Sequence, residues 1–154
     1  MPPKFALQSV LDYHHERVDK LEGEFGRLVQ LKVKALETLV SYENDMERIL
    51  GDLKELQTGE MDLQAIRLNR TNLKRVENNI EKQHQVIRNL EKEIEKKQIE
   101  LILARQDEAV FEKLKEKELE RFNEKIITQD KILQDDIYIS KAHRQPARKY
   151  EDTL

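Results

Sequence analysis

The sequence predicts an all-α fold: two long helices forming an antiparallel coiled-coil hairpin, with a longer second helix and a C-terminal overhang. The first observation is that the 154 residues contain three prolines, all near the ends (Pro2, Pro3 and Pro146), and only four glycines. The second is a composition of 38% charged and 5% aromatic residues, which is typical of long helices with charged surfaces and unlike that of sheets. The third is a spacing of three and four between apolar residues, which is that of a coiled-coil seam.

The first helix is expected over about residues 5–57, where two interleaved series of residues define a seam. Thirteen of the fifteen seam positions are apolar, a pattern narrower than the stripe of a globular helix. The first series is Leu7, His14, Leu21, Leu28, Ala35, Tyr42, Ile49 and Leu56, and the second is Leu11, Val18, Phe25, Lys32, Leu39, Met46 and Leu53.

A turn is expected at about 57–61, because the seam stops at Leu56 and Thr58-Gly59 follows. Glycine adopts the left-handed conformation that closes many helices, and the side-chain oxygen of threonine competes with helical hydrogen bonds. Gly51 is the other possible break, but the apolar spacing continues through it to Leu53 and Leu56.

The second helix is expected over about 62–142 with a similar seam. Ten of its fourteen seam positions are apolar: the series are Ile66, Leu73, Ile80, Ile87, Ile94, Leu101 and Glu108, and Asn69, Val76, Gln83, Leu90, Lys97, Ala104 and Phe111. After Phe111 the register shifts through Lys115, Leu119, Phe122, Ile126 and Leu133, and such a stutter locally unwinds a supercoil. Polar seam residues such as Lys32, Gln83, Lys97 and Glu108 indicate register control or, alternatively, a pliable hairpin.

Helices joined by a short turn are antiparallel neighbours, so paired residue numbers should add to about 118. The seams satisfy this rule with Leu28 opposite Leu90, Phe25 opposite Ile94, Val18 opposite Leu101, Leu39 opposite Ile80, Tyr42 opposite Val76 and Leu7 opposite Phe111. A single hairpin over residues 1–145 is therefore expected, with a disordered tail at 146–154 and with a dimer of hairpins as an open alternative.

Because paired residue numbers add to about 118, segment 114–140 has no partner in the first helix. This overhang either folds back or frays, or it is a surface for a partner. Partner binding is favoured by its many large apolar residues: Leu119, Phe122, Ile126, Ile127, Ile132, Leu133, Ile137, Tyr138 and Ile139.

Composition and motifs exclude several functional classes. The net charge of −3 argues against a nucleic-acid-binding protein, and the absence of cysteine argues against disulfides and thiolate zinc sites. No apolar run is long enough to span a membrane and no signal peptide is recognisable, so we expect a soluble cytosolic protein without membrane insertion. No nucleotide-binding or hydrolase motif occurs, and His14 and His15 point about 100° apart on a helix. We therefore expect no enzymatic activity, no cofactor and no metal site.

Three stretches resemble a known family, the FliJ proteins of the bacterial flagellar type III export apparatus. KFALQSVLDY at 4–13 resembles the start of these proteins, LVSYEN at 39–44 resembles the segment before their hairpin tip, and EKLKEKELERF at 112–122 is similar to a run late in their second helix. The similarity in length and layout extends over residues 4 to about 144. The stalk proteins of virulence type III secretion systems share this architecture and are the alternative, as is a generic coiled-coil tether.

The resemblance implies a non-enzymatic, chaperone-like central stalk in the cytoplasm, peripherally associated with the export apparatus at the inner face of the membrane. Its implied partners are the hexameric export ATPase, the cytoplasmic domain of the export gate and export chaperones. The positions that match the family's gate contacts are Leu39, Tyr42, Met46, Val76, Ile80 and Gln83. An aromatic residue often found one turn before Val76 in the family is replaced here by Asn72 or Leu73. The end that enters the ATPase ring corresponds to Phe5, Leu7, Leu119, Phe122 and Ile126.

Overall fold

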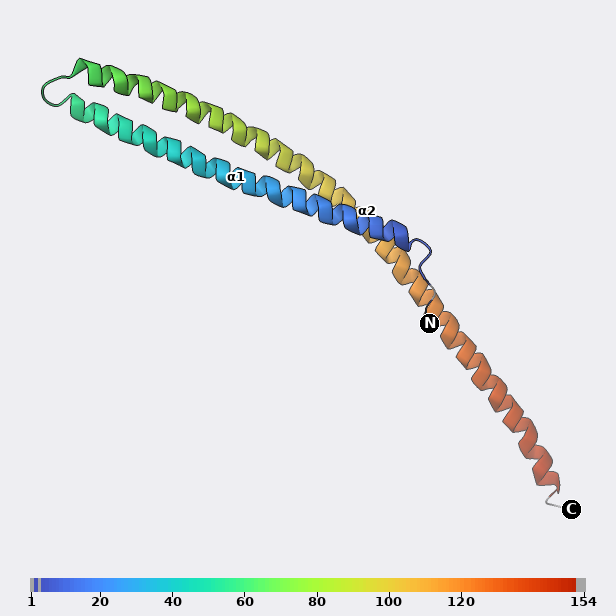
Figure 1. The fold of residues 1–154 in the computed structure, drawn as a ribbon. Coiled ribbons are helices and arrows are strands. Elements are labelled where there is room, and N and C mark those ends of the chain that lie inside the picture. Colours follow the sequence, from blue (N-terminus) through green and yellow to red (C-terminus); the bar gives the residue numbers. More distant parts are fainter. Residues whose placement is uncertain (1, 3, 152–154) are drawn as a thin grey trace. The chain divides into compact units, whose positions relative to one another are not determined.

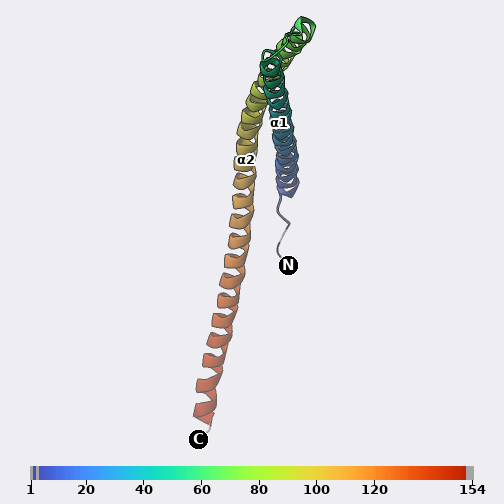
Figure 2. The same cartoon turned by 90° about the vertical axis from the view of Figure 1, so that its left-hand side faces the viewer.

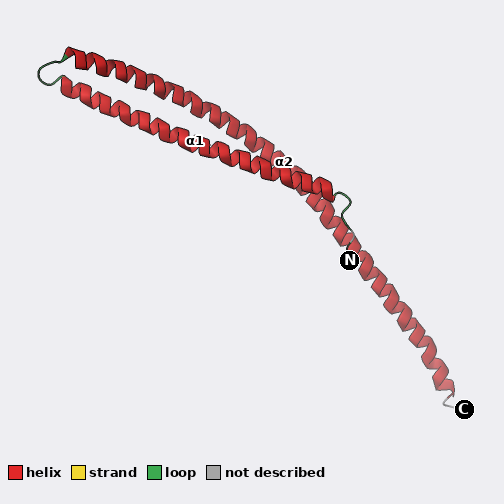
Figure 3. Ribbon diagram, viewed as in Figure 1, coloured by secondary structure: helices red, strands yellow, loops and turns green. Residues whose placement is uncertain are grey.

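The computed structural model describes residues 2 and 4–151, with side chains described as far as residue 143. These residues form two helices, α1 (Gln8–Leu56) and α2 (Leu63–Glu151), and no strand occurs among them (Figures 1 and 3). The prediction of an all-α hairpin with a longer second helix is therefore confirmed. None of the helices in this part of the chain is apolar enough over a sufficient length to cross a membrane.

The C-terminal end of α1 and the start of α2 are fixed by short-range hydrogen bonds. At the end of α1, both the backbone N–H and the hydroxyl of Thr58 donate to the carbonyl of Glu55. Gly59 follows with a φ of 131°, a conformation that residues with a Cβ rarely adopt. The carboxylate of Asp62 then accepts hydrogen bonds from the backbone N–H groups of Gln64 and Ala65, which caps α2.

The C-terminal end of α2 differs from the prediction. The helix continues beyond residue 142 and through Pro146 to Glu151, where a disordered tail was expected, and residues 152–154 lie outside those described. A proline inside a helix removes one backbone donor and crowds the carbonyl four residues earlier, which is why an end before Pro146 was expected.

Contacts divide the chain into two compact units. One is Glu16–Arg105, and the other combines Met1–His15 with Gln106–Leu154. In Glu16–Arg105, α1 and α2 lie side by side, as the views in Figures 1 and 2 both show. Three clusters of buried side chains hold them together: Val18, Leu21, Leu101 and Ala104; Ala35, Leu39 and Ile87; and Ile49, Leu53, Ile66 and Val76.

The predicted register agrees with the contacts nearer the turn and shifts with distance from it. Gln83 with Ala35 has residue numbers that add to 118, whereas Lys97 with Glu24, Lys32 with Glu91 and Arg105 with Glu22 add to 121, 123 and 127. Every predicted seam position from Leu11 to Leu56 and from Ile66 to Phe111 is buried or half-buried.

Two polar seam residues, Gln83 and Lys97, satisfy their polar atoms at the edges of the seam. The side-chain amide of Gln83 donates to the carbonyl of Ala35 at 2.8 Å, and the ammonium of Lys97 lies 2.8 Å from Glu24 and 3.3 Å from Glu100. The hydrogen bond to Glu24 raises the pKa of Lys97, and the same bond lowers the pKa of Glu24. Lys97 thus contributes its aliphatic stem to the seam and pairs its charge outside it.

Candidate partner surfaces

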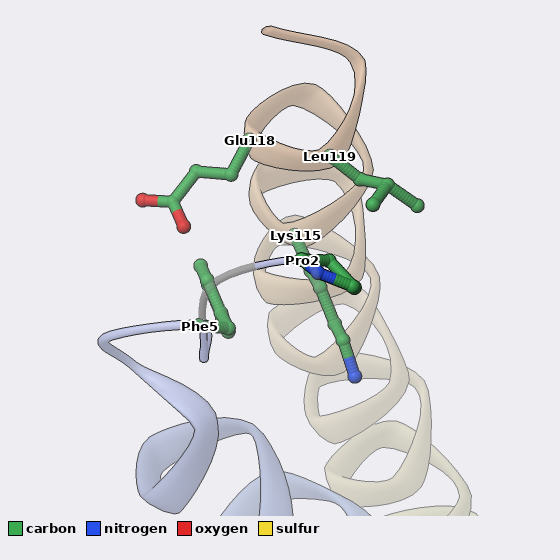
Figure 4. Close-up of a pocket in the computed structure, with 5 residues that line it drawn as sticks. All are labelled: Pro2, Phe5, Lys115, Glu118 and Leu119. Carbon is green, nitrogen blue, oxygen red and sulfur yellow. The ribbon is translucent and has the colours of Figure 1, made fainter. Parts of the chain in front are cut away.

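The unit that combines Met1–His15 with Gln106–Leu154 contains a small apolar hollow. Its lining residues are Pro2, Phe5, Lys115, Glu118 and Leu119. Figure 4 shows Pro2 and Phe5 on the N-terminal segment beside the three residues of α2. Phe5 is 9% exposed, whereas Leu119 is 49% exposed, so the hollow offers free apolar surface.

Most apolar residues of α2 beyond this hollow are exposed, and Phe122 is half-buried. Those from Leu133 to Ile139 are at least half exposed, and Ile126 is 39% exposed. Five apolar residues with helical spacing lie on one face of α2 and are here called the C-terminal stripe: Leu119, Phe122, Ile126, Leu133 and Ile137. Residues 114–143 belong to one continuous helix, α2.

The predicted ring-contact residues all belong to this unit, where they fall on more than one surface. Phe5 and Leu119 line the hollow, and Phe122 and Ile126 follow on the C-terminal stripe. Leu7 was expected to pair with Phe111, but it is 40% exposed, and the ring of His14 stacks on Phe111 instead, with centroids 4.8 Å apart. The numbers of His14 and Phe111 add to 125 and not to about 118, so the register in this unit differs from the predicted one, and Phe111 meets a residue one heptad beyond Leu7.

The histidines of α1 form a second feature of this unit. His15 Nδ1 lies 2.8 Å from Glu108 Oε2, and its Nε2 lies 3.8 Å from Glu112 Oε1. The hydrogen bond to Glu108 is the main cause that raises the pKa of His15, and the charges of Glu108, Glu112 and Asp12 act in the same direction against partial desolvation. The Nδ1 atom of His14 is buried and makes no hydrogen bond to any group that the structure describes.

His15, Glu108 and Glu112 also provide one possible metal-ligand atom each, all within 4.8 Å of one another. A nitrogen and two carboxylates would suit zinc. The His15–Glu108 hydrogen bond, however, already accounts for the arrangement as an ion pair between the helices. This group was not predicted from the sequence, where no histidine has a companion at ligand spacing within its own helix; the antiparallel register brings residue 15 close to residue 108.

The predicted gate-contact residues lie in the seam of the hairpin. Leu39 and Val76 are 8% and 6% exposed. Tyr42, Met46 and Ile80 pack against buried clusters, and Gln83 is hydrogen-bonded to α1. The structure gives all six a part in holding α1 to α2, and their role in binding the gate stays a prediction.

A basic segment at the start of α2 was also missed. Between Asp62 and Glu77 the chain contains four cations and no acid: Arg67, Arg70, Lys74 and Arg75. Over residues 58–145 basic and acidic residues balance, so the net charge of the second helix does not reveal this segment. A shorter window would have revealed the segment.

Comparison with known proteins identifies a family. No curated protein and no solved structure matches the chain significantly. The model of the family described as "Flagellar FliJ protein" matches residues 3–147, nearly the whole chain. The two-helix architecture and the C-terminal excess of α2 agree with this match. The chain therefore belongs to the FliJ family of flagellar export proteins.

Proposed function

We propose that this protein is a non-catalytic stalk of the flagellar type III export apparatus, located at the cytoplasmic face of the membrane. In this role it binds the hexameric export ATPase through the hollow and the C-terminal stripe, and it contacts the export gate and export chaperones through the hairpin. Membership of the FliJ family supports a non-catalytic export component, and it favours the flagellar system over the virulence systems.

The observation that supports ATPase binding most directly is the exposure of the C-terminal stripe. Burying a large apolar side chain contributes roughly 1.5–3 kcal/mol, so a helix with five such residues on one face gains considerably from a partner. The stripe follows directly on the hollow lined by Phe5 and Leu119, so one continuous stretch of α2 contributes to both apolar surfaces. A ring of subunits around this helix would bury residues on several of its sides. The off-stripe residues Ile127, Ile132 and Ile139, which are also exposed, fit that arrangement.

The test is the double substitution Phe122→Asp and Ile126→Asp. We expect it to abolish stimulation of ATP hydrolysis by the purified hexameric ATPase, because two carboxylates would be buried at the contact without partners. Circular dichroism should show an unchanged helix content, since Ile126 is exposed and Phe122 only half-buried.

The matched control replaces two exposed aliphatic residues elsewhere with the same acid: Val33→Asp and Val40→Asp, at positions 50% and 53% exposed on α1. This control should stimulate the ATPase as the wild type does. Unchanged stimulation by the Phe122 and Ile126 variant would show that the stripe does not bind the ring.

A further inference from the structure

The start of α2 carries a positively charged face. Arg67, Arg70, Lys74 and Arg75 are all exposed, and the first three have the spacing i, i+3, i+7 that places them on one side of the helix. Among the side chains that the structure describes, none of the four lies within 4 Å of a carboxylate. These charges are therefore available to a partner.

This basic face borders an open hollow at the turn of the hairpin. The hollow is lined by Gln57, Met61, Leu63, Ile66, Arg67 and Arg70. Met61 and Leu63 are each 66% exposed, so apolar surface lies directly beside two guanidinium groups. All of these residues belong to Glu16–Arg105, at the end where the turn joins α1 to α2 (Figure 1).

Helix stability does not account for this arrangement. The positive end of a helix dipole favours acidic residues in the first turn, and the first turn of α2 has none. The exposed Met61 and Leu63 likewise gain little from the hairpin itself. A partner that supplies carboxylates and an apolar side chain would stabilise both the basic face and the exposed apolar residues.

We infer that this tip face, formed by Met61, Leu63, Arg67, Arg70 and Lys74, binds an acidic segment of a partner protein. The guanidinium groups pair with carboxylates in two-pronged hydrogen bonds, and the hollow receives an apolar side chain between them. The inference rests on the proposed function, in which the hairpin contacts the export gate. It assigns that contact to exposed residues at the tip, whereas the family resemblance assigns it to residues of the seam.

A protein segment fits the tip face better than an anionic membrane does. Glu60 and Asp62 flank Met61 in the turn, so insertion of Met61 among anionic headgroups would bring two carboxylates against them. The carboxylate of Asp62 is also committed to capping α2. A protein partner can match the cations and leave these two acids in water.

The test measures binding of the full chain to the cytoplasmic domain of the gate by calorimetry at two salt concentrations. Replacing Arg67 and Arg70 with Glu should weaken binding about tenfold or more at low salt, because two attractive contacts become repulsive. The matched control, Lys92→Glu with Lys96→Glu, makes the same charge change at two exposed positions of α2 far along the chain from the tip. It should change the affinity less than about twofold.

Four results would overturn the inference. Equal losses in both variants would indicate an unspecific effect of net charge, and an unchanged affinity of the Arg67 and Arg70 variant would remove the tip site alone. The wild type could sediment with phosphatidylglycerol vesicles while the Arg67 and Arg70 variant does not. If that variant still binds the gate domain, lipid is the occupant of the tip face. If the wild type stimulates the ATPase but does not bind the gate domain, the gate contact of the proposed function fails together with the tip site.

Discussion

The hairpin Glu16–Arg105 and the stretch 114–143 of α2 use similar apolar residues in opposite ways. In the hairpin, residues at spacings of three and four are buried, as Leu21 and Leu101 are at 5% exposure each. In the second stretch, similarly spaced residues such as Ile126 and Leu133 are 39% and 60% exposed. The same pattern therefore produces a core where a second helix is present and a free surface where none is.

The difference between these two regions predicts unequal losses of stability for two leucine-to-alanine substitutions. Leu101→Ala should lower the free energy of unfolding by about 2–5 kcal/mol, because it leaves a cavity beside Val18, Leu21 and Ala104. Leu133→Ala should change it by less than about 0.5 kcal/mol, since the side chain is already in water. Urea denaturation followed by circular dichroism measures both. A loss for Leu133→Ala as large as that for Leu101→Ala would mean that the stretch is covered in the isolated protein, for example by a second copy.

Two glycine substitutions test whether the hairpin depends on its turn. Gly59→Ala should destabilise the protein by about 1 kcal/mol or more, because the φ of 131° is unfavourable for any residue with a Cβ. Gly51→Ala lies inside α1 with nothing within 4 Å of the added methyl group, and should stabilise the protein by about 0.5–1 kcal/mol. Thermal unfolding of both variants compares them directly. Destabilisation by Gly51→Ala would mean that α1 bends at this position.

The smallest effect is expected from pH at the His15–Glu108 pair. The folded state raises the pKa of His15, so the stabilisation is complete below the unfolded pKa of about 6.5 and is lost as pH rises through the folded value. Glu108→Gln should remove most of this dependence, because it removes the hydrogen-bonding carboxylate that raises the pKa. NMR titration of the His15 ring, with thermal unfolding between about pH 5.5 and 8, measures the effect. A His15 pKa at or below its ordinary value in the wild type would contradict the ion pair.

The sequence predicted the core of the hairpin well because a coiled-coil seam is a repeated local pattern. Residues as far apart as Val18 and Leu101 were correctly placed together, since a single turn at Gly59 and a constant rise per residue determine the whole register. The prediction was less successful at the ends. Leu7 continues the seam in sequence but precedes the first residue of α1, and Pro146 marked an expected limit that α2 passes.

The sequence by itself thus determined the two helices, their register and the surplus of apolar residues on the second, because these depend on spacing along one chain. Only the tertiary structure decided which side chains remain available to partners. It buried Leu39 and Val76 in the seam, left the tip face around Arg67 and Arg70 open, and joined His15 to Glu108. The physical reason is that exposure and ion pairing depend on which groups of the second helix lie opposite each residue, and helical periodicity does not specify those contacts atom by atom.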